Sequence, residues 1–599
     1  MTCEPVRRHH APRRIRSRFI AGLIISCALA LHAAGPARAQ RTPPAAAQQH
    51  FDRGVALLEK QQVARAISEL RMAIKLNPRY GEAHNALGLA LARSGDMKLA
   101  AESFRRAVEL DPKLYKAHRN LGRSLQQLGD IDGAMAALRQ SLALKSDDAD
   151  TRVLLGLVLQ QKGMADAAVA EFREAARLSP GMAEAHFYLG YALAARGELR
   201  AAISEFETTI RLKPDYGEAH YYLGTALWFS GDVEGAVAAL KSAAKRMPDH
   251  ADSHYYLGLA LRKAGDSQAA MGELTAAARL APDMIEPRHV MGQMLQESED
   301  LDGAVDAFRA VIKLKPDFIQ AYNDLGLALV SKRDPDGAIS AFNTALRLDP
   351  NNAVARHNLG MAFIQKGDYA AAVAEYRRLI ELAPESAEAH YNLGLALKNK
   401  DQFDEAIAEL KRATSLQPSL QEAHYTLGVI LLQQGKLDES AAAFKSALAQ
   451  KPDYAEARYA LGTVLQQQGD LDAAIASFRE AIRQAPNAPE IHNTLGTALR
   501  QKGDTEGARA EFQEAARLNK KKSDMQAATF AINTGIARLK EGNIDAAIER
   551  FEAAIKLAPD DAKAHYNLAR ALTQKGRREA AQAEFQKAKQ LDPRLKPLP

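Results

Sequence analysis

Histidine is the side chain of this sequence best suited to chemistry, because imidazole transfers protons near neutral pH and binds metal ions. Ten of the 16 histidines are separated by multiples of 34 residues, apart from a five-residue shift before the last: His50, His84, His118, His186, His220, His254, His390, His424, His492 and His565. A zinc site on one helix needs two histidines four residues apart, which this spacing does not provide. We interpret them as packing residues, with a pH-sensing ladder as the alternative, and predict no metal site.

Other catalytic groups do not accompany these histidines. Both cysteines, Cys3 and Cys27, lie in the first 39 residues, so neither a thiol nucleophile nor a disulfide framework is expected after them. We predict no catalytic residue and no cofactor, and therefore not an enzyme.

Glycine recurs at a fixed period, and the structural units that this period indicates must position any functional residue. Fourteen glycines follow one another at a constant step of 34 residues: Gly54, Gly88, Gly122, Gly156, Gly190, Gly224, Gly258, Gly292, Gly326, Gly360, Gly394, Gly428, Gly462 and Gly496. If each is numbered position 8 of a repeat, alanine stands at position 20 in thirteen repeats and a large apolar or aromatic residue at position 24 in all fourteen. Proline stands at position 32 in twelve, from Pro78 to Pro486. Such a period indicates stacked structural units, a solenoid.

Each repeat is predicted to fold as two helices. In residues 217–250, apolar residues with helical spacing precede Gly231, and a second such set follows it. Gly231 suits the left-handed turn that ends a helix, and Pro248 stops the second helix. Gly224 has no side chain, so we expect the second helix to approach it closely where Ala236 is equally small.

This pattern resembles the tetratricopeptide repeat (TPR) family. Two further copies follow a short break, the first anchored by Gly535 and Phe551 and the second by Leu568 and Phe585. The resemblance implies an all-α, right-handed superhelical solenoid of about 16 helix-turn-helix repeats. It also implies protein or peptide partners bound along the inner, concave face, without naming the partner.

The domain boundaries follow from the period. We predict a signal peptide at 1–39, a short linker at 40–46, fourteen contiguous repeats at 47–522, an insertion at 523–527, two further repeats at 528–595 and a tail at 596–599. Three lysines, residues 520–522, replace the proline there, and we interpret them as a solvated turn, with a hinge as the alternative. Glycine is also missing from the inter-helix turn at Glu299, Arg333 and Asp401, which predicts different local curvature.

Charge is concentrated in the first 39 residues. This segment has a net charge of +6, equal to that of the whole chain, so the remainder sums to zero. A nucleic-acid-binding surface requires clustered positive charge, and we therefore predict no nucleic-acid partner.

The same segment has the order of a secretory signal peptide. An arginine-rich stretch precedes an apolar run at 19–31, and Ala37-Arg38-Ala39 follows it. One alternative is an uncleaved anchor, but 13 residues give only ~20 Å of helix against a hydrocarbon core of ~30 Å. The other is lipidation at Cys27. We predict a periplasmic or secreted protein without a membrane span in the mature chain.

Aromatic residues at position 5 are the candidate binding residues. The resemblance implies that positions 2, 5, 9 and 12 of the first helix line the concave groove. The predicted peptide-binding residues are Phe187, Tyr221, Tyr255, Trp228, Tyr391, Tyr425 and Tyr459. Packing between repeats is the alternative role. Acidic residues recur at position 2, where they favour a helix N-terminus or, alternatively, steer a basic ligand.

The function that these observations favour is an exported, non-enzymatic scaffold for cell-envelope or secretion assembly, with an accessory subunit that presents substrates to a separate transferase as the alternative. Family members that bind a C-terminal carboxylate carry lysine at position 5. No repeat does here, and only Arg119, Asn120 and Arg123 approach that arrangement. TPR glycosyltransferases carry a large catalytic domain after the repeats, whereas this sequence ends at Pro599. The sequence does not indicate an oligomeric state.

The leader generates the first testable prediction. Cleavage after Ala39 should give a mature N-terminus at Gln40, measured by mass spectrometry of the exported protein. An acylated N-terminal Cys27 would instead establish the lipoprotein.

Overall fold

The computed structural model of the chain describes residues 43–595, 597 and 598. The predicted signal peptide at 1–39 lies outside the described residues.

Within the described residues the fold is all α-helical, with 31 helices and no β-strand. The helices are α1 (Ala45–Glu59), α2 (Val63–Leu76), α3 (Gly81–Arg93), α4 (Met97–Leu110), α5 (Tyr115–Gln127), α6 (Ile131–Leu144), α7 (Ala149–Gln161), α8 (Ala165–Leu178), α9 (Ala183–Ala195), α10 (Leu199–Leu212), α11 (Gly217–Ser230), α12 (Val233–Arg246), α13 (Ala251–Ala264), α14 (Ser267–Leu280), α15 (Glu286–Glu297), α16 (Leu301–Leu314), α17 (Ile319–Ser331), α18 (Pro335–Leu348), α19 (Ala353–Lys366), α20 (Tyr369–Leu382), α21 (Ala387–Lys398), α22 (Phe403–Leu416), α23 (Gln421–Gln433), α24 (Leu437–Gln450), α25 (Ala455–Gln467), α26 (Leu471–Gln484), α27 (Pro489–Lys502), α28 (Thr505–Lys540), α29 (Ile544–Leu557), α30 (Ala562–Gln574) and α31 (Arg578–Leu591).

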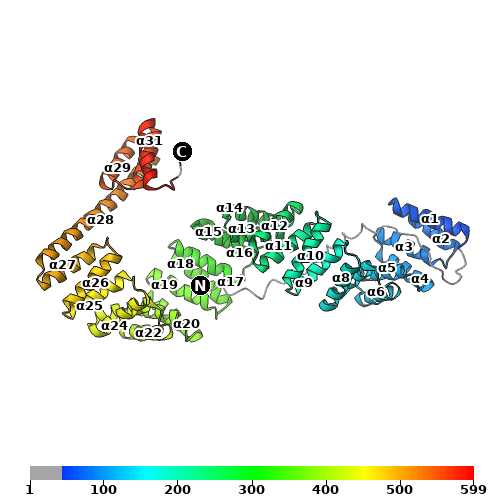
Figure 1. Cartoon of the computed structure of the whole chain (residues 1–599), viewed down its shortest axis with the longest axis horizontal. Helices are drawn as coiled ribbons and strands as arrows, with labels where there is room; N and C mark the ends of the chain where they lie inside the picture. Colours follow the sequence, from blue (N-terminus) through cyan, green and yellow to red (C-terminus); the bar gives the residue numbers. More distant parts are fainter. Residues whose placement is uncertain (1–42, 596, 599) are drawn as a thin grey trace. The chain divides into compact units, whose positions relative to one another are not determined.

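The chain divides between Pro316 and Asp317 into two compact units, the first ending with α16 and the second beginning with α17. In each, helices pack against their neighbours in chain order (Figure 1). We call the first helix of each repeat the A helix and the second the B helix. The predicted helix-turn-helix solenoid is confirmed.

The glycine at position 8 is the point of closest approach between the A and B helices. A Cβ atom added to Gly258 would lie 2.7 Å from Leu274 Cγ, and one added to Gly292 would lie 2.6 Å from Phe308 Cε1. The partner is therefore the large side chain at position 24. The predicted partner was the alanine at position 20, which instead contributes its backbone oxygen, at 3.3 Å from the Gly258 site.

The turn between the two helices has one conformation throughout. The residue at position 15 has a positive φ, as in Gly265 at 91°, and Glu299, Arg333 and Asp401 adopt it as well, with φ of 64°, 60° and 57°. Non-glycine residues thus take the glycine conformation. The different local curvature predicted for these three repeats stays a prediction.

The lysine run does not form the predicted turn. α28 continues through residues 520–527 as one helix of 36 residues. Residues 519–527 contain neither glycine nor proline, so nothing in the sequence ends the helix there. The B helix of repeat fourteen and the A helix of repeat fifteen are therefore a single helix, and the insertion at 523–527 lies inside it.

Across the described residues, none of the helices combines the length and the apolar character that crossing a membrane requires.

Two glycines with opposite surroundings give a stability test. Gly258→Ala should lower the local free energy of unfolding by about 1–3 kcal/mol, because the new methyl group overpacks against Leu274. The matched control is Gly272→Ala in α14, where an added Cβ meets nothing within 4 Å. The control should raise stability by up to about 1 kcal/mol, because alanine is the better helix former. Amide hydrogen exchange of α13 and α14 measures both, and effects of the same sign would contradict the proposed contact.

Candidate functional site

Phe187 is not available to a ligand. Its side chain is 5% exposed, and its ring stacks on Tyr216 at a centroid distance of 4.8 Å. Tyr216 stands at position 34, just before the next A helix. The expectation that Phe187 lines a binding surface is therefore corrected, because its ring fills the space between two repeats.

Tyr221, Tyr255 and Trp228 are half-buried and also pack toward the core. Tyr221 and Trp228 contact the buried cluster that contains Leu240, and Tyr255 contacts the cluster that contains Leu274. The Tyr221 ring also meets His250, at position 34, edge-on at 4.9 Å. The binding role of these three residues stays a prediction, and packing is the role their contacts establish.

The second aromatic run lies in the second compact unit and is tied to the following repeats. The Tyr459 hydroxyl lies 3.1 Å from Thr494 Oγ1, and the Tyr425 ring lies 5.1 Å from the ring of Tyr454. Burial raises the pKa of Tyr391, while its hydrogen bond with Thr426 lowers that pKa. These tyrosines link neighbouring A helices, and their predicted role in binding stays untested.

A continuous row of rings lies one residue further along the A helices of repeats five to seven. Tyr222 at position 6 contacts Tyr191 of the preceding repeat at 5.2 Å. Tyr256, also at position 6, contacts Tyr221 at 6.1 Å and Phe229 at 6.2 Å. We define the aromatic strip as Tyr188, Tyr191, Tyr222, Tyr256 and Phe229, and Tyr221 at position 5 packs beside it. Phe229 is 57% exposed, and the tyrosines are half-buried.

Helical spacing explains the strip. Positions 2, 6, 9 and 13 are separated by four, three and four residues, so they share one face of an α-helix. The predicted stripe of positions 2, 5, 9 and 12 shares positions 2 and 9 with this face. The missed signal was the adjacent aromatic pair in each of three repeats: Phe187-Tyr188, Tyr221-Tyr222 and Tyr255-Tyr256.

Carboxylates at position 2 border the strip. Burial raises the pKa of Glu218. Burial, followed by the charges of Glu218 and Glu184, raises the pKa of Tyr188 to about 12. The charge of Asp252 acts in the same direction on Tyr256, after burial. The rings and the acids thus share one electrostatic environment, and it is negative.

Cations that would neutralise these carboxylates are few. Lys213 lies 3.7 Å from Glu184, and its charge also acts on Glu218, where it lowers the pKa that burial raises. Within the described residues, Glu218 and Asp252 make no direct ion pair. Neither α9 nor α11 contains lysine or arginine, and α13 has them only in its last turn. A ligand cation above a tyrosine face would gain from the ring quadrupole and from the nearby carboxylates.

The histidines at position 4 connect repeats through polar contacts. His186 Nδ1 lies 2.6 Å from Glu205 Oε2, and its Nε2 lies 3.2 Å from the carbonyl oxygen of Pro180. Arg356 reaches the equivalent pair of acceptors on Glu375 and Pro350. We expected position 4 to pack between repeats. The structure shows that its side chain is a cation or a hydrogen-bond donor, and that its role is structural.

The repeat pattern and this geometry define a protein-interaction solenoid. Models described as Tetratricopeptide repeat match residues 26–79, 51–115, 119–183, 153–217, 187–236, 221–285, 290–353, 341–374, 459–523 and 532–595, and a model described as TPR repeat matches 360–401, 400–435 and 428–469. The chain belongs to the tetratricopeptide repeat family, whose members act as protein-interaction scaffolds and are typically non-catalytic. No curated protein sequence matches it.

Solved structures similar to the chain are TPR proteins of several kinds. The crystal structure of MamA is 30% identical over 27% of this chain and 95% of its own, with a TM-score of 0.26. YrrB, described as a TPR protein with an unusual peptide-binding site, is 23% identical over 32% of this chain and 98% of its own, with a TM-score of 0.30. Yeast Tom70 is 20% identical over 73% of this chain and 96% of its own, also with a TM-score of 0.30. The family assignment rests on the repeat models.

His220 generates a prediction on pH. Its Nε2–H donates to the Pro214 carbonyl oxygen at 2.9 Å, and position 23 of its repeat is Ala239 instead of glutamate. Burial lowers the pKa of His220. The unfolded state therefore binds protons first, so stability is present above about pH 6.5 and falls as the pH drops toward the folded-state pKa.

Ala239→Glu should reduce this acid-dependent loss, because it supplies the carboxylate that Glu205 supplies to His186. The measurement is thermal unfolding followed by the fluorescence of Trp228, the one tryptophan of the sequence, which lies in the same helix. Ala239→Gln is the neutral control. Equal behaviour of the two variants between neutral and mildly acidic pH would contradict the explanation.

Proposed function

We propose that the protein is an exported, non-enzymatic scaffold that binds basic, partly apolar segments of partner proteins along the aromatic strip. Membership of the TPR family supports protein binding in general. Its export is supported by the basic, apolar and small-residue order of the first 39 residues. Exported scaffolds of this kind serve cell-envelope or secretion assemblies by bringing their components together.

The observation that carries the choice of site is the combination of partly exposed rings with carboxylates that lack ion-pair partners. Phe229 is 57% exposed at one end of the row, and Glu218 lies beside Tyr188 and Tyr222. Tyrosine and other aromatic residues dominate the energetics of protein interfaces, because they bury a large, rigid surface at low entropic cost. Opposite charges add specificity and speed the encounter.

A lysine side chain matches both parts of the strip. Its methylene groups cover the aromatic rings, and its ammonium group reaches the carboxylates at the edge. An arginine side chain stacks on the rings in the same way. An acidic segment would meet uncompensated negative charge and should not bind.

Two substitutions on the strip test the site. A fluorescent ten-residue peptide rich in lysine and leucine should bind the parent chain, and its counterpart with glutamate in place of lysine should not. Phe229→Ala and Glu218→Gln should each weaken binding by about tenfold or more, as expected for central interface residues. Glu218→Gln should also reduce the dependence of the affinity on salt. Fluorescence anisotropy measures the affinities.

Glu422→Gln is the matched control, because Glu422 occupies position 2 in the second aromatic run, where position 6 is Thr426. It should leave the affinity unchanged. An equal loss in the control would show a general charge effect and contradict the site. A pull-down from envelope extract then identifies the partner, and recovery of a transferase in place of envelope components would favour an accessory subunit.

A further inference from the structure

α28 contains both halves of an interface between two repeats, and because the helix is continuous it keeps these halves apart. Its first part is the B helix of repeat fourteen, and its last part is the A helix of repeat fifteen. Figure 1 shows it as one uninterrupted helix between α27 and α29. Phe512 in the first part and Phe530 in the last part are 18 residues apart, which is about 27 Å along an α-helix at ~1.5 Å per residue.

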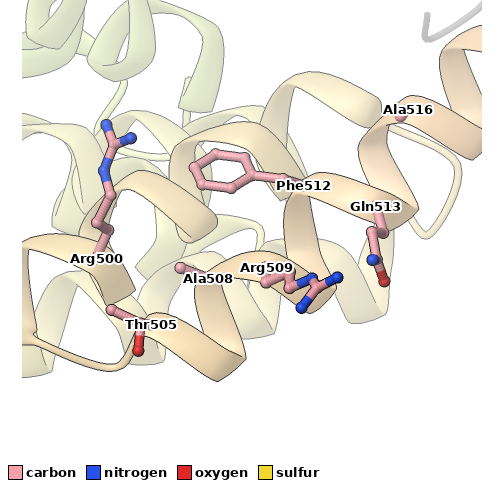
Figure 2. A pocket seen from close by; sticks show the side chains of 7 residues that line it. All are labelled: Arg500, Thr505, Ala508, Arg509, Phe512, Gln513 and Ala516. Atoms are coloured by element: carbon pink, nitrogen blue, oxygen red, sulfur yellow. The ribbon is translucent and has the colours of Figure 1, made fainter.

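The first half is an uncovered hollow on repeat fourteen. In the first thirteen repeats and in the fifteenth, the side chain at position 24 is at most 1% exposed, from Leu70 and Phe104 to Phe478 and Phe551. Phe512 is only half-buried. It lines a hollow of about 370 Å³ with Ala508 and Arg500, whose guanidinium carbon lies 5.6 Å from the ring centroid (Figure 2).

The second half is an exposed phenylalanine on repeat fifteen. Phe530 stands at position 3 and is 74% exposed. The residue at position 3 is buried in the second to fourteenth and in the sixteenth repeats: Ala83, Ala117, Thr151, Ala185, Ala219, Ser253, Pro287, Ala321, Ala355, Ala389, Ala423, Ala457, Ile491 and Ala564.

The first described repeat differs from the others at position 3. It has Gln49 at position 3, a polar residue, and no described repeat precedes it. Terminal repeats of solenoids carry polar outer faces. Phe512 and Phe530 are apolar, so the two faces of α28 have the composition of an internal interface.

The preceding interface shows how two such faces fit together. Ile491, at position 3 of repeat fourteen, lies in one buried cluster with Phe478 and Ala481 of repeat thirteen. Phe512 and Ala515 stand at the equivalent positions of repeat fourteen, and Phe530 stands where Ile491 stands. A large side chain at position 3 is therefore accommodated against a phenylalanine at position 24.

We propose that the occupant of the Phe512 hollow is Phe530 of a second copy of this chain, and that two copies exchange these faces in a reciprocal dimer. The same molecule cannot bring the two faces together while α28 is continuous. A two-fold arrangement fills both hollows and closes the assembly without exposing a further face.

Charge at the rim of this interface makes the association weak and provides a second test. Other repeats are joined by an ion pair from position 14 to position 18 of the preceding repeat, as in Arg196–Asp166 at 2.7 Å and Lys366–Asp336 at 2.7 Å. At the proposed interface these positions are Glu541 and Glu506, which repel each other. Glu541→Lys should restore the attraction.

Sedimentation velocity of the purified full chain over a range of micromolar concentrations tests the proposal. The parent should shift from monomer to dimer as its concentration rises. Phe530→Ala should weaken dimerisation by about tenfold or more, and Glu541→Lys should strengthen it. Val354→Ala is the control, because it truncates another exposed apolar side chain, 63% exposed, and should leave dimerisation unchanged.

A parent that stays monomeric at every concentration would overturn the proposal, and so would a dimer unaffected by Phe530→Ala. Hydrogen exchange tests the other possible occupant of the hollow, which is Phe530 of the same chain. Rapid exchange at residues 519–527 in a monomer, together with protection of the segment around Phe530, would show that α28 breaks and that the chain covers its own hollow. That result would identify the occupant of the hollow as the chain's own Phe530 and not that of a second copy.

Discussion

The close approach of two helices at position 8 is the constraint on which the rest of every repeat depends. A side chain larger than hydrogen at Gly258 or Gly292 would occupy the space of Leu274 or Phe308. Because the glycine has no Cβ, the residue at position 24 fills the centre of the repeat. That residue is at most 1% exposed except in repeats fourteen and sixteen, on which no following repeat packs. Because the A helix is fixed against the B helix in this way, its remaining faces have defined tasks. One face packs on neighbouring repeats, and another is left to a ligand.

Positions 5 and 6, which are adjacent on the A helix, differ in what they contact. The ring at position 5 packs against the residue at position 34, as in Phe187 on Tyr216 and Tyr425 on Tyr454. Position 6 lies beside it, where Tyr222 and Tyr256 contact rings from the preceding repeats and Tyr222 also stacks on the buried Phe206. Adjacent positions of one helix therefore carry a packing ring and a ring of the proposed binding surface. The acids at position 2 belong to both functions, since they favour the helix N-terminus and border the rings.

The period of 34 residues was sufficient to predict the type and order of the helices, because glycine, alanine and proline stand at fixed places in each repeat. The 16 predicted helix pairs are 31 helices in the structure, because α28 joins two of them. It was not sufficient to predict which residue of the A helix faces outward. That depends on the packing angle between helices, and one residue corresponds to a rotation of about 100°. The lysine run was misread because charge suggested a turn, whereas only glycine, proline or a cap ends a helix. The site residues at position 6 were visible as aromatic pairs, but the choice within each pair required the structure.

Four of the left-handed turns carry strain that glycine would avoid, those at Gln61, Glu299, Arg333 and Asp401. A non-glycine residue at positive φ carries backbone strain, and Glu299 and Arg333 carry it in two consecutive repeats, at φ of 64° and 60°. These two turns lie on either side of the division between Pro316 and Asp317. In a solenoid each repeat is held mainly by its nearest neighbours, so strain is not shared along the chain. Each of these four turns therefore lowers the stability of its own repeat and leaves distant repeats, including those of the aromatic strip, unaffected.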